Sequence, residues 1–113
     1  MGLELIKSIY ERKAEERERA RGKFIKSVFD ALKKLAGEAY FREAYLFGSV
    51  TKPYQFGEAS DVDIAFEGLD PEKLFFSVGF LDRELGREVN AVLLENIPFR
   101  EKILREGIKW KRN

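Results

Sequence analysis

The sequence predicts a small α+β domain: a mixed β-sheet with helices packed on one face, preceded by a long charged N-terminal helix. Three observations predict this fold class. Apolar residues recur at helical spacing near the N-terminus, short apolar strands alternate with amphipathic helices in the rest of the chain, and 113 residues is the length of one domain. We divide the chain into a helical extension, residues 1–21, and a core domain, residues 22–113.

The first predicted element is a helix over residues 3–35. Its apolar stripe consists of Leu3, Ile6, Tyr10, Phe24, Val28, Leu32 and Leu35. Between the two halves of this stripe runs "ERKAEERERARGK", which is nearly all charge and typical of a solvated helical face with ion pairs along it. Gly22 is a candidate break or kink in the helix, and Gly37 is suited to end it.

The remaining elements alternate between strands and helices. We expect strands at residues 42–47, 61–66 and 88–94, helices at residues 71–85 and 98–105, and a short edge strand around Ile108 and Trp110. The start of the helix at residue 71 is well marked, because Asp70 suits the N-cap and Pro71 the first helical position. If the helices cover one face of the sheet, the other face is left open where the second strand begins.

The composition limits the chemistry that this chain can perform. Lys and Arg (21) nearly balance Asp and Glu (20), so the net charge of +1 gives no reason to expect nucleic acid or membrane binding. The absence of Cys and His excludes disulfides, thiolate catalysis and imidazole bases. Any metal must therefore have oxygen ligands, which favours Mg²⁺ or Mn²⁺. We find neither a membrane-spanning stretch nor a signal-peptide pattern, and we expect a cytoplasmic protein.

Two carboxylates stand at the start of the second predicted strand. Asp61 and Asp63 project from the same side of that strand, about 7 Å apart along the backbone, because alternate residues of a strand share a face. Two acids in this position repel each other and raise each other's pKa unless a cation lies between them. The pair is therefore a candidate metal site. The alternative is a strand edge that faces water, with both aspartates simply solvated.

A Gly-Ser pair follows the first predicted strand directly. Gly48 and Ser49 expose backbone N–H groups and a hydroxyl at the strand end, and such groups commonly bind phosphate oxygens. The alternative is an ordinary turn, in which glycine and serine are equally at home. Because both motifs occur in order, each at the end of a strand, we interpret them together as a phosphate and metal site.

The segment "LFGS…SDVDIAF" resembles the signature of the minimal nucleotidyltransferases in the DNA polymerase β-like superfamily, in which Gly-Ser is followed after a spacer by Asp-x-Asp. The resemblance covers the chain from about Phe24 to Lys109. It includes "ILREGIKW", which is similar to the closing helix and strand of that family. The resemblance implies a polymerase β-like core and an enzyme that uses ATP or another NTP.

The resemblance also implies roles for particular residues. Gly48 and Ser49 would hold the triphosphate, and Asp61 and Asp63 would bind Mg²⁺ or Mn²⁺. The spacer between the motifs is one residue longer than is usual in the family. Lys52 is the nearest cation at a place where the family often carries arginines, and lysine lacks the bidentate fork of a guanidinium.

The third strand departs from the family pattern. "GREVNAVLL" places Asn90 where the family has a third aspartate, which completes the metal site and helps to activate the attacking hydroxyl. An asparagine can offer a carbonyl oxygen to a metal, but it cannot accept a proton. Glu88 lies two residues earlier on the same strand face and could take the place of the missing acid. The alternative for Glu88 is a solvated residue at the start of the strand.

The predicted helix after Asp70 suggests a surface for a partner. Phe76 and Phe80 are four residues apart, opposite the apolar stripe that faces the core. Chance exposure, or cover by the N-terminal helix, would explain them equally well. The resemblance implies a small helical partner of the HEPN type, with the two proteins acting as toxin and antitoxin. Self-association is the other arrangement that we consider.

Two functions remain open at this point. The first is transfer of a nucleoside monophosphate, AMP from ATP, to a hydroxyl on a partner protein, with Asp61, Asp63 and either Glu88 or Asn90 in the catalytic positions. The second is a degenerate nucleotidyltransferase fold that neutralises or regulates a partner by contact alone. The intact Gly-Ser and Asp-x-Asp motifs favour the enzyme, whereas Asn90 and the altered loop favour the binding module.

Overall fold

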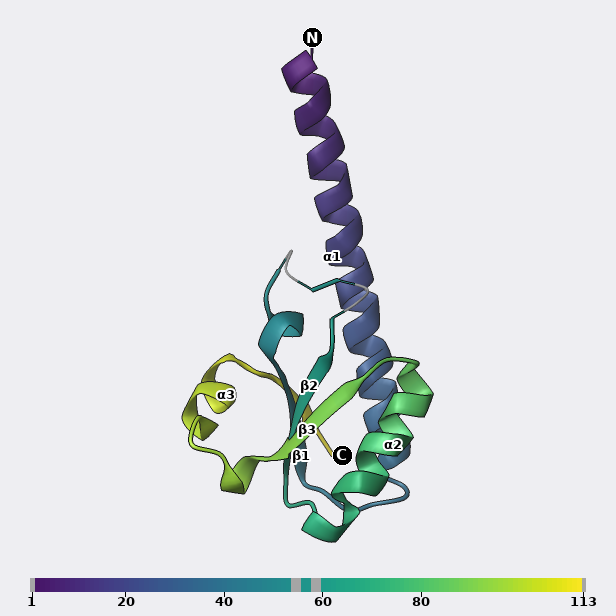
Figure 1. The fold of residues 1–113 in the computed structure, drawn as a ribbon, viewed down its shortest axis with the longest axis vertical. Coiled ribbons are helices and arrows are strands. Elements are labelled where there is room, and N and C mark those ends of the chain that lie inside the picture. Colours follow the sequence, from purple (N-terminus) through teal and green to yellow (C-terminus); the bar gives the residue numbers. More distant parts are fainter. Residues whose placement is uncertain (1, 54–55, 58–59, 113) are drawn as a thin grey trace.

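The computed structural model describes residues 2–53, 56–57 and 60–112. Its elements, in chain order, are α1 (Gly2–Leu35), β1 (Glu43–Phe47), the 3₁₀ helix η1 (Gly48–Thr51), β2 (Val62–Glu67), η2 (Pro71–Lys73), α2 (Leu74–Leu85), β3 (Val89–Leu93), η3 (Leu94–Asn96), α3 (Arg100–Glu106) and β4 (Ile108–Lys111) (Figure 1). Each predicted strand and helix is present, with ends that differ by up to three residues; the helix predicted from residue 71 begins as η2 and continues as α2. None of the described helices is long and apolar enough to cross a membrane.

The four strands form one mixed sheet in the order β3-β2-β1-β4, which confirms the predicted fold class. β1 is antiparallel to both β2 and β4, and β2 is parallel to β3. In this register Asp63 lies opposite Phe47, the last residue of β1, and beside Asn90 of β3. The sheet therefore brings the second and third predicted strands together at the ends that carry the polar residues.

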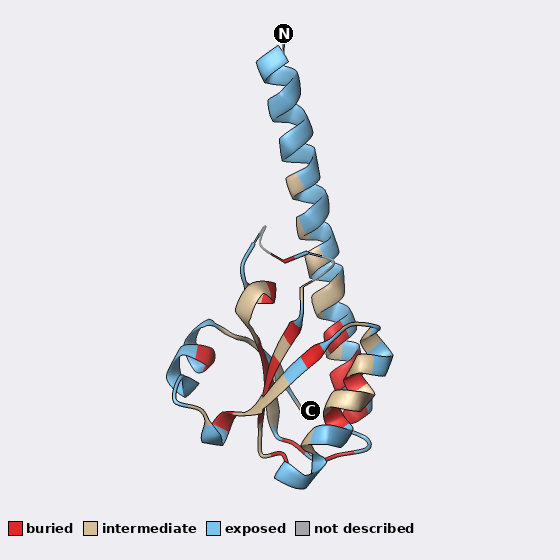
Figure 2. Cartoon of the chain, viewed as in Figure 1, coloured by how far each residue is buried: buried red, intermediate tan, exposed pale blue. Residues whose placement is uncertain are grey.

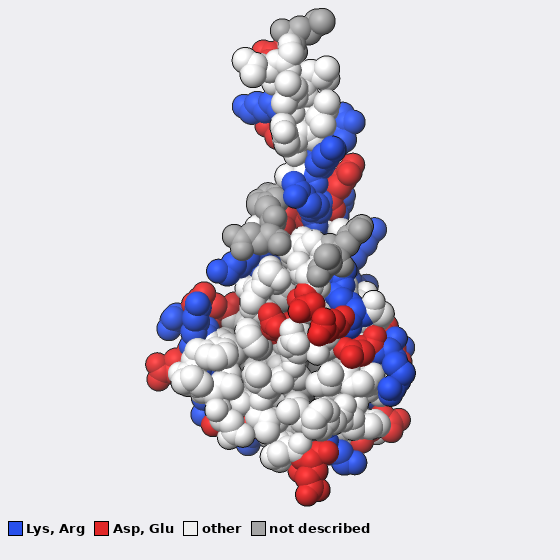
Figure 3. Space-filling model, in the orientation of Figure 1, with Lys and Arg blue, Asp and Glu red and all other residues white. Residues whose placement is uncertain are grey.

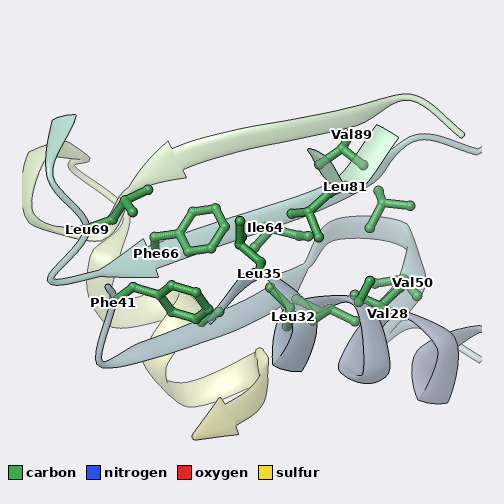
Figure 4. Close-up of a cluster of buried hydrophobic side chains, with 14 of the residues drawn as sticks. Val28, Leu32, Leu35, Phe41, Val50, Ile64, Phe66, Leu69, Leu81 and Val89 are labelled. Carbon is green, nitrogen blue, oxygen red and sulfur yellow. The ribbon is translucent and has the colours of Figure 1, made fainter. Parts of the chain in front are cut away.

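The first face of the sheet is covered by α1 and α2, as the apolar stripes predicted. Side chains from the helices interlock with alternate residues of β1 and β2 and with Phe41 of the loop before β1. The largest fully buried side chains of this cluster are Leu32, Leu35, Phe41, Leu46, Ile64, Phe66 and Leu81 (Figure 4). Figure 2 shows that only the C-terminal part of α1 takes part in this core. The burial of this many large side chains makes the first face the main source of hydrophobic stabilisation.

The second face is less open than the sequence predicted, because α3 lies over part of it. A smaller cluster forms there from Tyr45, Ala65, Leu94 and Ile103. Alternate residues of β1 and β2 supply the first two, and Ile103 is the buried residue of α3. A helix of seven residues covers only a fraction of the sheet, so the end that carries Asp63 is left accessible.

The helix α1 is continuous through Gly22, so the break considered at this residue does not occur. Its first turns project away from the rest of the protein, so that the molecule as a whole is elongated and measures 59 × 28 × 24 Å (Figure 1). Leu3, at 85% exposure, has no core to pack against. At the last residue of the predicted extension, Arg21 donates through Nη1 to the backbone oxygen of Val50 in η1, over 2.7 Å.

The loop after α1 is held by the C-terminal end of the chain. The guanidinium of Arg112 donates to the backbone oxygens of Ala36 (3.0 Å) and Phe41 (3.2 Å) and stacks over the ring of Tyr40. Gly37 does not have the left-handed backbone conformation of a typical helix-ending glycine, in contrast to Gly86 at the end of α2. The last carbonyl groups of α1 accept backbone hydrogen bonds from Gly37, Glu38 and Ala39, whereas Arg112 satisfies carbonyl groups beyond the end of the helix.

Candidate active site

The parallel pairing of β2 and β3 assembles a polar cluster at the start of both strands. The side-chain amide of Asn90 donates through Nδ2 to Asp61 Oδ2 and to Asp63 Oδ1, each over 3.3 Å. The two carboxylates therefore converge on one point, which the amide of Asn90 occupies. Figure 3 shows acidic side chains gathered where β2 and β3 begin.

The charged form of the Asp63 carboxylate lies in an unfavourable electrostatic environment. Partial burial, with the negative charge of Asp61 as a further cause, raises the pKa of Asp63 above its ordinary value of 3.8. The hydrogen bond from Asn90 acts in the opposite direction, because it favours the charged form. The amide thus only partly offsets the cost of holding two like charges together.

Gly48 brings the backbone of η1 against this carboxylate pair. It has a φ of 76°, a left-handed conformation that favours glycine, and a Cβ added at this position would collide with Asp63 Oδ2. Glycine is therefore required here both for its conformation and for its lack of a side chain. Thr51 Oγ1 donates to the backbone oxygen of Gly48 over 2.7 Å and fixes the turn.

The other predicted phosphate ligands lie in or directly after the same turn. Ser49 is half-buried within η1, and the backbone N–H of Lys52 donates to its carbonyl oxygen over 3.1 Å. The side chain of Lys52 is exposed, and it lines a pocket that Gly48 also lines. The structure thus brings Gly48 against Asp63 and keeps Lys52 close to the turn.

Glu88 lies one residue before β3 and is exposed. Its backbone oxygen accepts a hydrogen bond from the N–H of Val62 over 3.0 Å, which continues the pairing of the two strands. Within the described part of the chain, no group of three or more Asp, Glu, His or Cys side chains is placed to hold a metal ion. The structure therefore does not gather Glu88 with Asp61 and Asp63, and its catalytic role stays a prediction.

The aromatic residues of α2 are placed differently from one another. Phe76 is 42% exposed, whereas Phe80 is half-buried and packs against the main core. Their ring centroids lie 6.1 Å apart. Phe75 is 92% exposed, and the spacing of four residues that singled out Phe76 and Phe80 does not include it. A partner surface on α2 stays a prediction.

A set of residues beside Gly48 was also missed. Phe99, Lys102, Ile103 and Glu106 lie on one side of α3 and its start, at the helical spacing i, i+3, i+4 and i+7, and line a pocket together with residues of η1. The spacing was visible in the sequence. It was not recognised because two of the four residues are charged, and the side is therefore not an apolar stripe.

The mixed sheet, the glycine turn and the converging aspartates are those of a nucleotidyltransferase-type fold. A solved structure described as that of a "putative minimal nucleotidyltransferase" is similar to this chain, with a TM-score of 0.51 and 26% sequence identity. The similarity covers 84% of this chain and 93% of that one. No protein-family model and no curated protein sequence matches the chain.

Proposed function

We propose that this protein is a metal-dependent nucleotidyltransferase that transfers AMP from ATP to a hydroxyl on a partner protein. The observation that carries the proposal is the convergence of Asp61 and Asp63 directly beside the Gly48 turn. A phosphate held by the turn would lie next to the two carboxylates. This is the arrangement that a reaction on a nucleoside triphosphate requires.

The donor set fits Mg²⁺ or Mn²⁺. Asp61 and Asp63 offer carboxylate oxygens, and the amide of Asn90 can turn to offer its carbonyl oxygen in place of its N–H. The raised pKa of Asp63 reflects like charge and burial that a cation would relieve. When bound, the metal would neutralise phosphate charge and polarise the phosphorus centre.

The residues of the chain bind and orient the reactants. The backbone of Gly48 and the hydroxyl of Ser49 would hold the phosphate oxygens, and Lys52 would balance their charge. In the transfer, the acceptor hydroxyl oxygen forms a bond to the α-phosphorus while the bond to the bridging α–β oxygen breaks. Pyrophosphate leaves, and the hydroxyl proton passes to water or to a nearby carboxylate, for which Glu88 is the predicted candidate.

The acceptor in this proposal belongs to a second protein. A small HEPN-type helical protein in a toxin–antitoxin pair is the partner that we expect. The exposed apolar residues of α1, among them Leu3 and Ile6, and the exposed Phe76 support a protein surface of this kind. Self-association through the same residues is the alternative.

A second function is favoured by Asn90. Its amide already satisfies both carboxylates, and the described residues supply no third acid next to them. A protein with this arrangement would keep the fold, bind nucleotide weakly or not at all, and regulate its partner by contact. The two functions predict different responses to Mg²⁺.

The first experiment is a calorimetric titration of ATP into the protein with and without Mg²⁺, repeated on Asp61→Ala/Asp63→Ala. The enzyme proposal expects binding that depends on Mg²⁺ and is lost in the double variant. Asp30→Ala is the matched control, because Asp30 is an exposed aspartate on α1, and it should bind as the wild type does. Absence of binding in the wild type would overturn the enzyme proposal in favour of the binding module.

A further inference from the structure

A pocket of about 290 Å³ lies between η1 and α3 on the second face of the sheet. The residues of its lining that carry the argument are Phe47, Gly48, Lys52, Phe99, Lys102 and Glu106. No role was predicted for the aromatic residues or for the α3 residues among them. The proposed transfer uses only the phosphates of the nucleotide, so the site of the nucleoside is still to be assigned.

The pocket is continuous with the candidate active site. Phe47 is the pairing partner of Asp63 across β1 and β2, and its side chain shares the second face with that aspartate. Gly48 lines the pocket and also contacts the Asp63 carboxylate closely enough to exclude a Cβ. A nucleotide whose phosphates lie at Gly48 therefore has this pocket as its immediate neighbour.

The shape and chemistry of the pocket suit a flat aromatic group. The rings of Phe47 and Phe99 lie 6.1 Å apart at 58°, and Phe99 is 44% exposed, which leaves a ring face free. Lys52 and Lys102 flank the rings, and neither forms an ion pair within the described residues. Free cations at the rim and an aromatic floor are the features by which proteins hold phosphate and base together.

We infer that this pocket binds the nucleobase of the nucleoside triphosphate, with the base stacked on Phe99 and the carboxylate of Glu106 accepting a hydrogen bond from an exocyclic amino group. The inference rests on the proposed function. Glu106 is the carboxylate among the described lining residues, and its only ion pair there is a long contact of 3.5 Å with Arg105. Its oxygens are therefore available to an amino group such as that of adenine.

The stacking part of the inference is tested by comparing ATP with inorganic triphosphate, which lacks a base. We expect Phe99→Ala to weaken ATP binding in Mg²⁺ by about 5- to 150-fold, the range for loss of a base–aromatic stack. Binding of inorganic triphosphate should be unchanged. Phe99→Leu should resemble the alanine variant because it keeps apolar bulk without a ring, and Phe99→Tyr should bind ATP normally.

Phe75→Ala is the matched control, because it removes an exposed phenylalanine from α2 and should leave both ligands unaffected. Equal ATP affinity in the wild type and all Phe99 variants would overturn the inference. That result would indicate that the pocket receives something else, such as a side chain of the acceptor protein. If the wild type binds neither ATP nor inorganic triphosphate, the proposed function fails as well, so the two failures are distinguishable.

The hydrogen-bonding part is tested with ITP, which carries a carbonyl where ATP carries its amino group. The wild type should prefer ATP over ITP by at least about tenfold, because a carboxylate facing a carbonyl is left without a donor. Glu106→Gln should reduce this preference, since an amide can donate to the carbonyl. An unchanged ratio of the two affinities in Glu106→Gln would overturn the role of Glu106 in base recognition.

Discussion

Two carboxylates on the second face of the sheet differ in what surrounds them. Glu43, at the start of β1, accepts a 2.7 Å contact from Lys109 Nζ and a hydrogen bond from the hydroxyl of Tyr45. The hydrogen bond with Lys109 is the main cause that lowers the pKa of Glu43 below its ordinary value of 4.5. Asp63 lies opposite the other end of β1, and burial and a neighbouring carboxylate raise its pKa.

The comparison separates a charge that the fold stabilises, that of Glu43, from one that it does not, that of Asp63. The folded protein favours the charged form of Glu43, so the charge of this carboxylate contributes to stability. The folded protein disfavours the charged form of Asp63, because this carboxylate lacks a counter-ion, which a ligand could provide. Carboxylates with a raised pKa beside a second acid are common at sites that bind metals or move protons. The following changes test this difference, beginning with the largest expected effect.

Gly48→Ala should have the largest effect on stability and on nucleotide binding, because it disturbs both the backbone of the turn and its packing against Asp63. The added methyl group meets Asp63 Oδ2, and alanine is strained at a φ of 76°. We expect the free energy of unfolding to fall by about 2–3 kcal/mol, and Mg²⁺-dependent nucleotide binding to be lost. Urea unfolding measures the first and calorimetry the second.

Gly22→Ala is the control for this substitution. Nothing lies within 4 Å of a Cβ at Gly22, and alanine favours a helix interior. We expect a gain of up to about 1 kcal/mol in the free energy of unfolding, with no change in binding. Normal stability and normal binding in Gly48→Ala would contradict the close contact between the turn and the carboxylate.

Asn90→Asp replaces the amide between the two carboxylates by a third acid. In the absence of metal, the free energy of unfolding should fall by about 1–2 kcal/mol, because two hydrogen bonds are lost and like charge is added. Mg²⁺ should restore it, and nucleotidyl transfer should increase. Unfolding with and without Mg²⁺ measures both effects, with Asn96→Asp, an exposed asparagine of η3, as the control.

Glu88→Ala completes the test of the third ligand. If Glu88 supplies the missing carboxylate, its removal abolishes transfer and Asn90→Asp changes little. If the amide position is the one that matters, Asn90→Asp raises transfer and Glu88→Ala has little effect. A measurable activity that responds to neither change would contradict both assignments.

Asp63→Asn removes the unfavourable charge while keeping an oxygen for Asn90. The free energy of unfolding without metal should rise by a few tenths of a kcal/mol, a small value because Asp63 is partly exposed and solvent screens its charge. Mg²⁺-dependent binding should be lost in the same variant. A loss of stability instead would show that the pair is structural.

Glu43→Gln should have the smallest effect on the free energy of unfolding. At neutral pH the sign should be opposite to that for Asp63→Asn, because Glu43→Gln removes a stabilising charge. The stability that Glu43 provides is present above pH 4.5 and is lost as the pH falls through its lowered folded pKa. The destabilisation that the charged Asp63 causes also disappears on acidification. It begins to disappear at a higher pH, at the raised folded pKa of Asp63, and is gone once the pH falls below the ordinary value of 3.8. Unfolding of the wild type and both variants between pH 3 and 7 should therefore give differences of opposite sign.

Most of the fold could be predicted from the sequence, because strand alternation, helical periodicity and capping residues are local patterns that determine where its strands and helices lie. Alternation placed Asp61 and Asp63 on one side of a strand, and Asp70 accepts a hydrogen bond from the N–H of Glu72, as its N-cap role predicts. The mixed sheet and long N-terminal helix were likewise predicted and are confirmed.

Long-range placement could not be predicted in the same way. The contact of Arg21 with Val50 joins residues 29 apart, and nothing in either local sequence indicates it. The position of α3 on the second face depends on how β4 returns beside β1, which periodicity does not determine. The orientation of the Asn90 amide toward both aspartates depends likewise on the register of β3 against β2.

The amide between Asp61 and Asp63 also has a genetic consequence. Codons for asparagine and aspartate differ by a single base, so a point mutation at Asn90 would exchange the hydrogen-bonded aspartate pair for a cluster of three acids. The strand pairing would not have to change for this exchange. A single base change is therefore enough to alter the number of carboxylates at this site on the same scaffold.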